Sequence, residues 1–74
     1  MTLYELANDV TIQGNVRVST WEGNEEKVIS TTENTDDFNI YDLDDKWEDA
    51  EVLYIFCPGD GYLHIEIENV EANE

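Results

Sequence analysis

Two stretches of the chain alternate between apolar and polar residues, and this period of two is typical of a half-buried β-strand. The first stretch covers residues 10–20, and its inward positions are Val10, Ile12, Gly14, Val16 and Val18. The second covers residues 62–69, with Leu63, Ile65 and Ile67 inward and His64, Glu66 and Glu68 outward. Gly14 interrupts the first inward row, which indicates a bulge or a close approach of backbone.

Two further strands are expected beside these. Residues 26–32 follow a turn at residues 22–25, so they should pair with the first strand as an antiparallel hairpin. Residues 51–57 are apolar almost throughout, which predicts a central strand covered on both faces. Pro58 ends this strand because proline cannot continue the ladder of hydrogen bonds. With residues 62–69 it forms a second hairpin.

Two segments carry the signs of short helices. Thr2 and Glu5 fit a capping box, so a helical turn is expected over residues 2–8, with Leu3, Leu6 and Ala7 inward. A helical spacing also relates Ile40, Leu43 and Trp47, which predicts a short helix or helical turns near residues 39–48. The predicted fold is one α+β domain over residues 1–74. It consists of a four-stranded antiparallel sheet made of two hairpins, a short N-terminal helix and a helical segment between the hairpins.

The charge of the chain narrows the list of partners. Nineteen Asp and Glu residues face three basic residues, and the formal net charge is −16. Repulsion at this density opposes a compact state, so we expect stability to rise with added salt, which screens the repulsion. Direct binding to nucleic acid or to an anionic membrane needs more basic residues than these three. Without an apolar run of transmembrane length or a signal-peptide pattern, a cytoplasmic protein is expected.

Candidate catalytic and metal-binding residues are few. His64 is the single histidine and lies on the outward face of a strand, where a polar surface residue is expected. Cys57, the single cysteine, lies in an apolar run, which predicts a buried and inert thiol. One Cys and one His cannot supply the four ligands of a structural zinc site, and the acidic stretches starting at Asp36 and Asp42 lack the glycine of an EF-hand. We therefore expect a protein that is not an enzyme, with no metal and no cofactor.

The outward carboxylates are the remaining candidates for a binding site. The candidate partner-binding residues are Asp42, Asp45, Asp49, Glu66, Glu68 and Trp21. The three aspartates share one face of the expected helix, and the two glutamates lie about 6.6 Å apart along a strand. Rows of anions on rigid elements can occupy a basic groove that evolved to bind nucleic acid. The expected partner is therefore a basic, nucleic-acid-binding surface of another protein, with Trp21 as an aromatic anchor.

Three alternatives stay open, one of which is a metal-dependent or other enzyme that a calcium or magnesium titration saturating at integer stoichiometry would support. The charge could serve solubility alone, although a net charge of about 2–8 in magnitude suffices for a small domain. The protein could also be a self-associating structural or accessory protein that forms a homodimer through an exposed edge strand, such as either strand of the first hairpin.

Three stretches of the chain carry a resemblance to known proteins. They are the opening Met1-Thr2-Leu3-Tyr4-Glu5-Leu6, the strand Thr11-Ile12-Gln13-Gly14-Asn15-Val16-Arg17-Val18, and the ending Tyr62-Leu63-His64-Ile65-Glu66-Ile67. In these stretches the chain resembles small acidic proteins of unknown function carried by phages and integrative elements of Gram-positive bacteria. Some small acidic phage proteins inhibit host defence, including anti-CRISPR and anti-restriction proteins that mimic DNA. The resemblance implies such an inhibitory role and carries over no functional residue.

Overall fold

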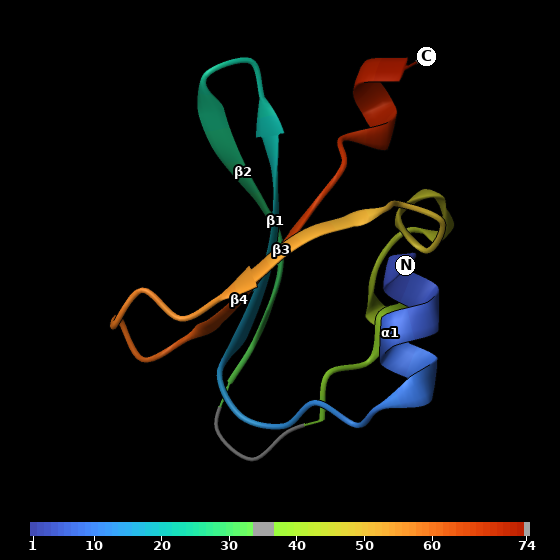
Figure 1. Ribbon diagram of the computed structural model, residues 1–74. Helices are drawn as coiled ribbons and strands as arrows, with labels where there is room; N and C mark the ends of the chain where they lie inside the picture. The colour runs from blue at the N-terminus through green and yellow to red at the C-terminus, as the bar shows by residue number, and fades with distance from the viewer. Residues whose placement is uncertain (34–36, 74) are drawn as a thin grey trace.

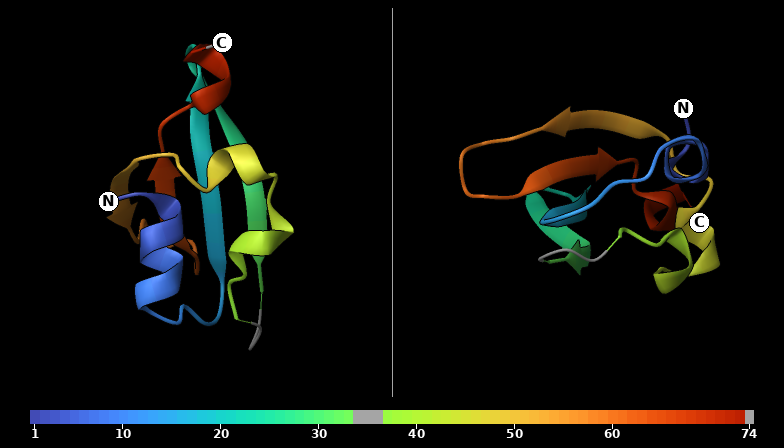
Figure 2. Two further views of the ribbon diagram at one scale, coloured as in Figure 1. Left: turned by 90° about the vertical axis from the view of Figure 1, so that its right-hand side faces the viewer. Right: turned by 90° about the horizontal axis from the view of Figure 1, so that it is seen from below.

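Four strands form one sheet, and a layer of helical segments covers one of its faces (Figure 1). The computed structural model describes residues 1–33 and 37–73. The strands are β1 (Val16–Glu22), β2 (Glu25–Thr32), β3 (Val52–Phe56) and β4 (Leu63–Ile67). In these ranges the helical elements are α1 (Leu3–Asp9) and the 3₁₀ helices η1 (Ile40–Asp42), η2 (Asp45–Trp47) and η3 (Val70–Asn73). Figure 2 shows α1 and the segment with η1 and η2 on the same side of the sheet.

The sheet is mixed, which corrects the predicted antiparallel topology. Its strand order is β2-β1-β4-β3. The two expected hairpins form, but β1 and β4 join them in parallel. Alternation along a strand indicates which of its faces is buried, and it carries no information on how two hairpins meet. Here they meet through the two strands that contain the buried residues of the sheet, with Val16 beside Leu63 and Val18 beside Ile65.

The N-terminal helix forms where the capping box predicts it. The Thr2 side chain accepts a hydrogen bond from the Glu5 backbone N–H at 3.1 Å, and the Glu5 carboxylate accepts one from the Thr2 N–H at 3.0 Å. These bonds satisfy backbone donors that have no partner inside the helix. Leu3 is fully buried, and its N–H donates to the Ala50 carbonyl at 2.9 Å. The helix is thus fixed to the segment that precedes β3.

No α-helix forms near residues 39–48, so of the predicted short helix or helical turns only turns are present. The segment instead makes two single 3₁₀ turns, η1 and η2. Aspartate favours caps and turns over helix interiors, because its short side chain competes for the backbone hydrogen bonds. The three residues with helical spacing are nevertheless buried in the core, as predicted: Ile40, Leu43 and Trp47. Two short turns therefore bury the side chains that the helical spacing predicted to be buried.

β3 is an edge strand, although an apolar run predicted a central strand covered on both faces. In the described chain its strand neighbour is β4, and its other side faces outward. Val52 packs against the core, whereas Leu53, Tyr54, Ile55 and Phe56 are exposed. α1 lies over β4 and the segment with η1 and η2 over β1 and β2, so the helical layer leaves most of β3 uncovered (Figure 2). The apolar run of β3 therefore forms an exposed surface of the sheet and not part of its core.

The first strand begins later than predicted. Val10 is exposed and Ile12 packs partly against the core, but β1 starts only at Val16. The Ile12 carbonyl accepts a hydrogen bond from the Phe38 N–H at 2.7 Å, so this part of the chain pairs with the segment that leads to η1. Gly14 has a φ of +95°, a conformation that glycine adopts without strain, and it reorients the chain before β1. No helix in the described ranges has the length and apolar character needed to cross a membrane.

Candidate functional site: an acidic layer and an open sheet face

The six predicted partner-binding residues lie on more than one surface. Asp42, Asp45 and Asp49 are exposed on the helical layer, in η1, in η2 and just after η2. Glu66 and Trp21 lie on the opposite face of the sheet, where the Trp21 Nε1–H donates to the Glu66 Oε1 at 2.5 Å. Glu68 follows β4 and is exposed. The structure therefore brings the three aspartates together on one layer and separates them from Glu66 and Trp21.

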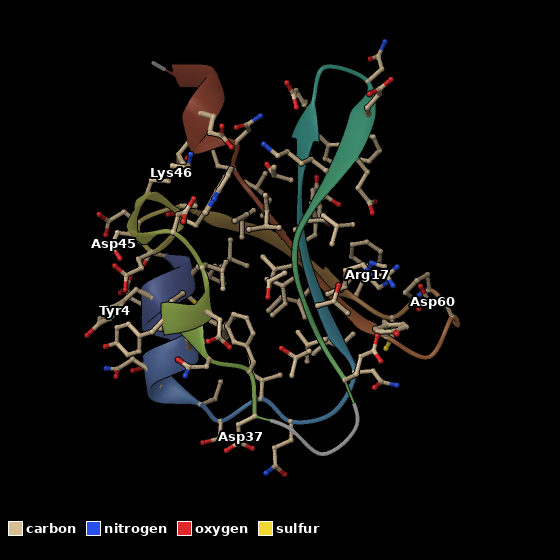
Figure 3. The ribbon with its side chains drawn as sticks, turned by 180° about the vertical axis from the view of Figure 1, so that it is seen from behind. Tyr4, Arg17, Asp37, Asp45, Lys46 and Asp60 are labelled. Carbon is tan, nitrogen blue, oxygen red and sulfur yellow. The ribbon has the colours of Figure 1, made fainter. Side chains whose placement is uncertain are left out.

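The helical layer carries a larger acidic surface than the sequence indicated. We define the acidic layer as the carboxylates of α1 and of residues 37–51: Glu5, Asp9, Asp37, Asp42, Asp44, Asp45, Glu48, Asp49 and Glu51. All are exposed except Glu48, which is half-buried. Figure 3 shows Asp37 and Asp45 on this side, apart from Arg17 and Asp60. α1 contributes to the layer because its N-terminus hydrogen-bonds the 48–50 backbone.

Two tyrosines lie within the acidic layer. Tyr41 is 72% exposed and interacts with Tyr4, which projects from α1 (Figure 3). The pKa of Tyr41 is raised, first by the charge and then by the hydrogen bond of Tyr4, and also by the nearby Glu48 carboxylate. Exposed tyrosines among carboxylates provide flat apolar contact area with a polar end, which is common in protein interfaces.

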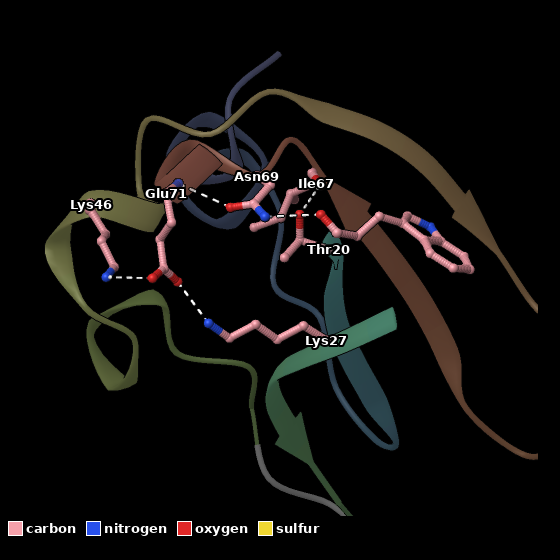
Figure 4. Close-up of polar contacts among 7 residues, drawn as sticks. Thr20, Lys27, Lys46, Ile67, Asn69 and Glu71 are labelled. Atoms are coloured by element: carbon pink, nitrogen blue, oxygen red, sulfur yellow. Dashed lines mark hydrogen bonds and ion pairs between the residues drawn. The ribbon is translucent and has the colours of Figure 1, made fainter. Parts of the chain in front are cut away.

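The basic residues are held by partners inside the protein. Lys27 Nζ lies 2.9 Å from one carboxylate oxygen of Glu71, and Lys46 Nζ lies 3.5 Å from the other (Figure 4). Lys27 is the main cause of the lowered pKa of Glu71. The Arg17 guanidinium lies over the Tyr62 ring, 4.4 Å from its centre. Lys46 is thus the one lysine or arginine within residues 37–51 of the acidic layer, and its ion pair with Glu71 offsets its charge.

Glu71 is positioned by hydrogen bonds that connect η3 to the sheet. The Asn69 side chain accepts from the Glu71 N–H at 3.0 Å and donates to the Trp21 carbonyl at 2.9 Å (Figure 4). The buried Thr20 hydroxyl donates to the Ile67 carbonyl at 2.8 Å. These bonds fix the end of β4 and the start of η3 against β1, so Glu71 can reach both lysines.

The sheet face opposite the helical layer, here the open face, carries a polar and aromatic cluster around His64. His64 lies on this face as predicted, but it is buried, which corrects the expectation of a surface residue. Phe56 of β3 stacks on its ring at 5.2 Å, and its Nε2 lies 2.8 Å from Asp60 Oδ2. His64 is the main cause of the lowered pKa of Asp60. The histidine is thus covered by residues that only the β3–β4 pairing brings to it.

Cys57 is exposed, which corrects the prediction of a buried thiol. It lies at the outer end of the edge strand β3, and its Sγ donates to the Tyr62 carbonyl at 3.5 Å. His64 Nε2 makes its hydrogen bond with Asp60, so this nitrogen is not paired with a thiol or a hydroxyl. Among the residues that the structure describes, no group of three or more metal-ligating side chains gathers.

A polar hollow of about 560 Å³ opens between the end of β2 and the acidic layer. It is lined by Thr31, Thr32, Glu33, Asp37, Asn39 and Asp42. Small-molecule sites are usually lined mainly by apolar and aromatic side chains, with a few polar groups that orient the ligand. This hollow has the opposite composition, so its chemistry suits a basic group better than a small apolar ligand.

No family model matches the chain, and the comparisons with curated proteins and with solved structures give no significant match. The resemblance to small acidic phage proteins therefore stays a prediction, and the functional argument rests on the residues of this chain.

Proposed function

We propose that the protein is a non-enzymatic acidic binding protein, whose acidic layer occupies a basic, nucleic-acid-binding surface of a partner protein. The observation that carries this proposal is the concentration of carboxylates on one layer. Nine acidic side chains belong to it, and the one lysine within its segment, Lys46, is paired with Glu71. A surface of this kind presents a predominantly negative potential to a partner, with the Met1 ammonium paired to Glu51 at 2.6 Å as a second internal counter-charge.

A rigid layer favours this role over a solubility function alone. Glu48 and Ala50 accept backbone hydrogen bonds from α1, and Trp47 anchors the segment in the core. The carboxylates are therefore displayed from fixed backbone, as phosphates are along a duplex. A surface that served solubility alone would gain nothing from such fixation, since only its charge would matter.

A role as a DNA mimic that inhibits a host defence system is a narrower form of the same proposal. The partner would normally bind phosphates, so its groove would contain Arg and Lys and its affinity would fall steeply with salt. The acidic layer would compete for that groove. Duplex DNA would then displace the protein from its partner, whereas an uncharged polymer would not.

The test is an affinity capture from nuclease-treated bacterial lysate, eluted first with salt and, in a parallel sample, with duplex DNA. We expect the retained protein to be a nucleic-acid-binding protein that both eluents release. The matched variants each reverse three charges. Asp42→Lys, Asp45→Lys and Asp49→Lys change the acidic layer, and Glu22→Lys, Glu25→Lys and Glu26→Lys change the β1–β2 hairpin by the same charge.

The two triple variants separate a specific surface from bulk charge. Because both have the same net charge, a loss of capture in the acidic-layer variant alone supports the proposal. Equal capture by both variants would remove the acidic layer from consideration. Equal loss in both would mean that net charge, and not this layer, causes retention.

A further inference from the structure

The two edge strands of the sheet differ in chemistry. β2 begins with the charged residues Glu25, Glu26 and Lys27. β3 contains no charged residue, and the uncharged run of residues 52–59 is the longest in the chain. Proteins commonly protect an exposed strand edge with charges, prolines, bulges or a covering loop. β2 is protected by charge over its first three residues. On β3 a bulge lies between Val52 and Tyr54 and Pro58 follows the strand, so the apolar stretch between them requires another explanation.

The N-terminus covers only the first part of the β3 edge. The Val52 N–H donates to the Met1 carbonyl at 2.8 Å, and Thr2 forms an antiparallel bridge with Glu51. A register shift in the pairing with β4 falls at the same place, between Val52 and Tyr54. The edge is open from Leu53 onward. Four consecutive large apolar side chains are exposed there, from Leu53 to Phe56, with Tyr54 at 64%.

We propose that the open part of this edge, residues 53–57, pairs with the same residues of a second copy of the chain. The two strands run antiparallel about a two-fold axis at Ile55. Ile55 then faces its own counterpart, Tyr54 faces the partner's Phe56, and Leu53 faces the partner's Cys57. Two four-stranded sheets become one continuous sheet, and the interface has the closed symmetry of a dimer.

This pairing is self-complementary in its chemistry. Every pair is apolar on both sides, and aromatic cross-strand pairs such as Tyr54 with Phe56 are among the more favourable ones. Both of these residues lie on the open face, as their pairing with Glu66 and His64 of β4 shows. Residues on the open face of one copy therefore pair with residues on the open face of the other, and Ile55 pairs with Ile55 on the inner face.

The position of Glu51 favours an antiparallel pairing, and the lack of charge on residues 53–57 favours a second copy of the chain as the partner. Glu51, the nearest acidic residue in sequence, lies opposite Gly59 of the other copy, and the two Glu51 residues are about 27 Å apart along the strands. A parallel pairing in register would place the two Glu51 side chains next to each other. A charged partner segment would have no counter-charge on residues 53–57, whereas a second copy needs none.

The dimer and the acidic layer respond to salt in opposite directions. Two chains of net charge −16 repel each other, and this repulsion is screened beyond about 8 Å at physiological ionic strength. Dimerisation should therefore strengthen as salt is added, whereas binding of a basic partner should weaken. The interface does not depend on the proposed function, and failure of either proposal leaves the other testable.

Sedimentation equilibrium with a reducing agent tests the proposal directly. We expect a mass near the monomer value of 8.5 kDa at about 20 mM NaCl and near twice that value at about 500 mM NaCl. The Cys57 residues of the two copies would be about 14 Å apart along the strands, which is too far for a disulfide. A reducing agent should therefore leave the dimer intact. A monomer at both salt concentrations overturns the proposal, and so does a dimer that exists only when Cys57 is oxidised.

Matched variants locate the interface. Ile55 and Val28 are both 48% exposed, and they lie on the two opposite edge strands. Ile55→Lys should weaken dimerisation at least about tenfold because two lysines meet at the axis, whereas Val28→Lys should not weaken it. Tyr54→Lys provides a second disruptive variant at a more exposed position, in case Ile55→Lys does not fold. If Val28→Lys weakens the dimer and the β3 variants do not, the contact is elsewhere and the proposal is wrong.

Hydrogen exchange gives an independent measurement on the wild-type protein. Amides of residues 53–57 should become more protected as protein concentration rises at high salt, and amides of β2 should not change. Protection that appears on β2, or larger assemblies that grow without limit, would contradict a closed dimer through β3.

Discussion

Ile55 and Ile65 form a matched pair that tests the position of β3. They face each other across the β3–β4 ladder and point to the same side of the sheet. Their burial is opposite, because Ile65 is fully buried and Ile55 is 48% exposed. Had β3 been the central strand that its apolar run predicts, both would be buried. Truncation of each residue to alanine therefore distinguishes the two positions.

The magnitudes follow from this burial. Truncation of a fully buried isoleucine to alanine removes the transfer free energy of the side chain and leaves a cavity, at a cost of about 2–5 kcal/mol. At Ile55 about half of the side chain is already in water and no closed cavity forms, so we expect a cost of about 0.5–1.5 kcal/mol. A chain of this size is stable by roughly 4–11 kcal/mol, so Ile65→Ala takes a large share of the total.

Urea unfolding followed by tryptophan fluorescence measures both variants. The protein must be kept at low salt and low concentration, because a dimer would bury Ile55 and raise its cost. If Ile65→Ala does not fold, the valine variants preserve the comparison, with about 0.5–1.5 kcal/mol expected at Ile65 and less at Ile55. Equal losses at the two positions would refute the assignment of β3 to the edge of the monomer.

The remaining predictions concern caps, salt and acid. Thr2→Ala should lower the free energy of unfolding by about 1 kcal/mol, since the capping box loses its side-chain acceptor, and Thr2→Ser should restore it; no loss in urea unfolding would contradict the cap. The melting temperature of the wild type should rise from low to moderate NaCl, and a flat or falling value would contradict the expected charge repulsion. Glu5, Asp60 and Glu71 have lowered pKa values, so their contribution to stability is fully present above their ordinary values of 4.5, 3.8 and 4.5 and is lost at lower pH. Glu71→Gln should reduce that acid loss, and a urea midpoint that rises steadily down to about pH 3 would show that relief of repulsion outweighs these three groups.

The parts of the fold that depend on neighbouring residues could be predicted from the sequence. The capping box of α1 and the alternation in β4 are local patterns, and both elements form as expected. The burial of Trp47 could also be predicted, because spacing brings apolar side chains together whether the backbone is an α-helix or two 3₁₀ turns. The type of helix could not, since it depends on how aspartate side chains compete for local hydrogen bonds.

Several features that depend on distant residues were predicted wrongly, although the two expected hairpins form. The uncharged sequence of β3 suits either a buried strand or an interface, and only its place beside β4 decides between them. The burial of His64 depends on Phe56 and Asp60, which the β3–β4 pairing brings against it. The candidate site was split for a similar reason. Alternation places Glu66 outward, but it cannot tell that the helical layer with Asp42 covers the other face.

At intermediate salt, where both contacts form, the two proposed surfaces would reinforce each other. An antiparallel pairing of identical edge strands requires a two-fold axis perpendicular to the sheet, because a two-fold axis along the strands would make them parallel. Such an axis keeps both helical layers on the same side of the joined sheet, so a dimer would present two acidic layers to one partner. A second contact made within the same complex raises the overall affinity without any new interaction, provided that both layers reach basic surface. The dimer variant Ile55→Lys should therefore retain partner binding but with lower affinity, and most of that loss should appear as faster dissociation. An Ile55→Lys variant that binds the partner as tightly as the wild type would show that the monomer is the active form.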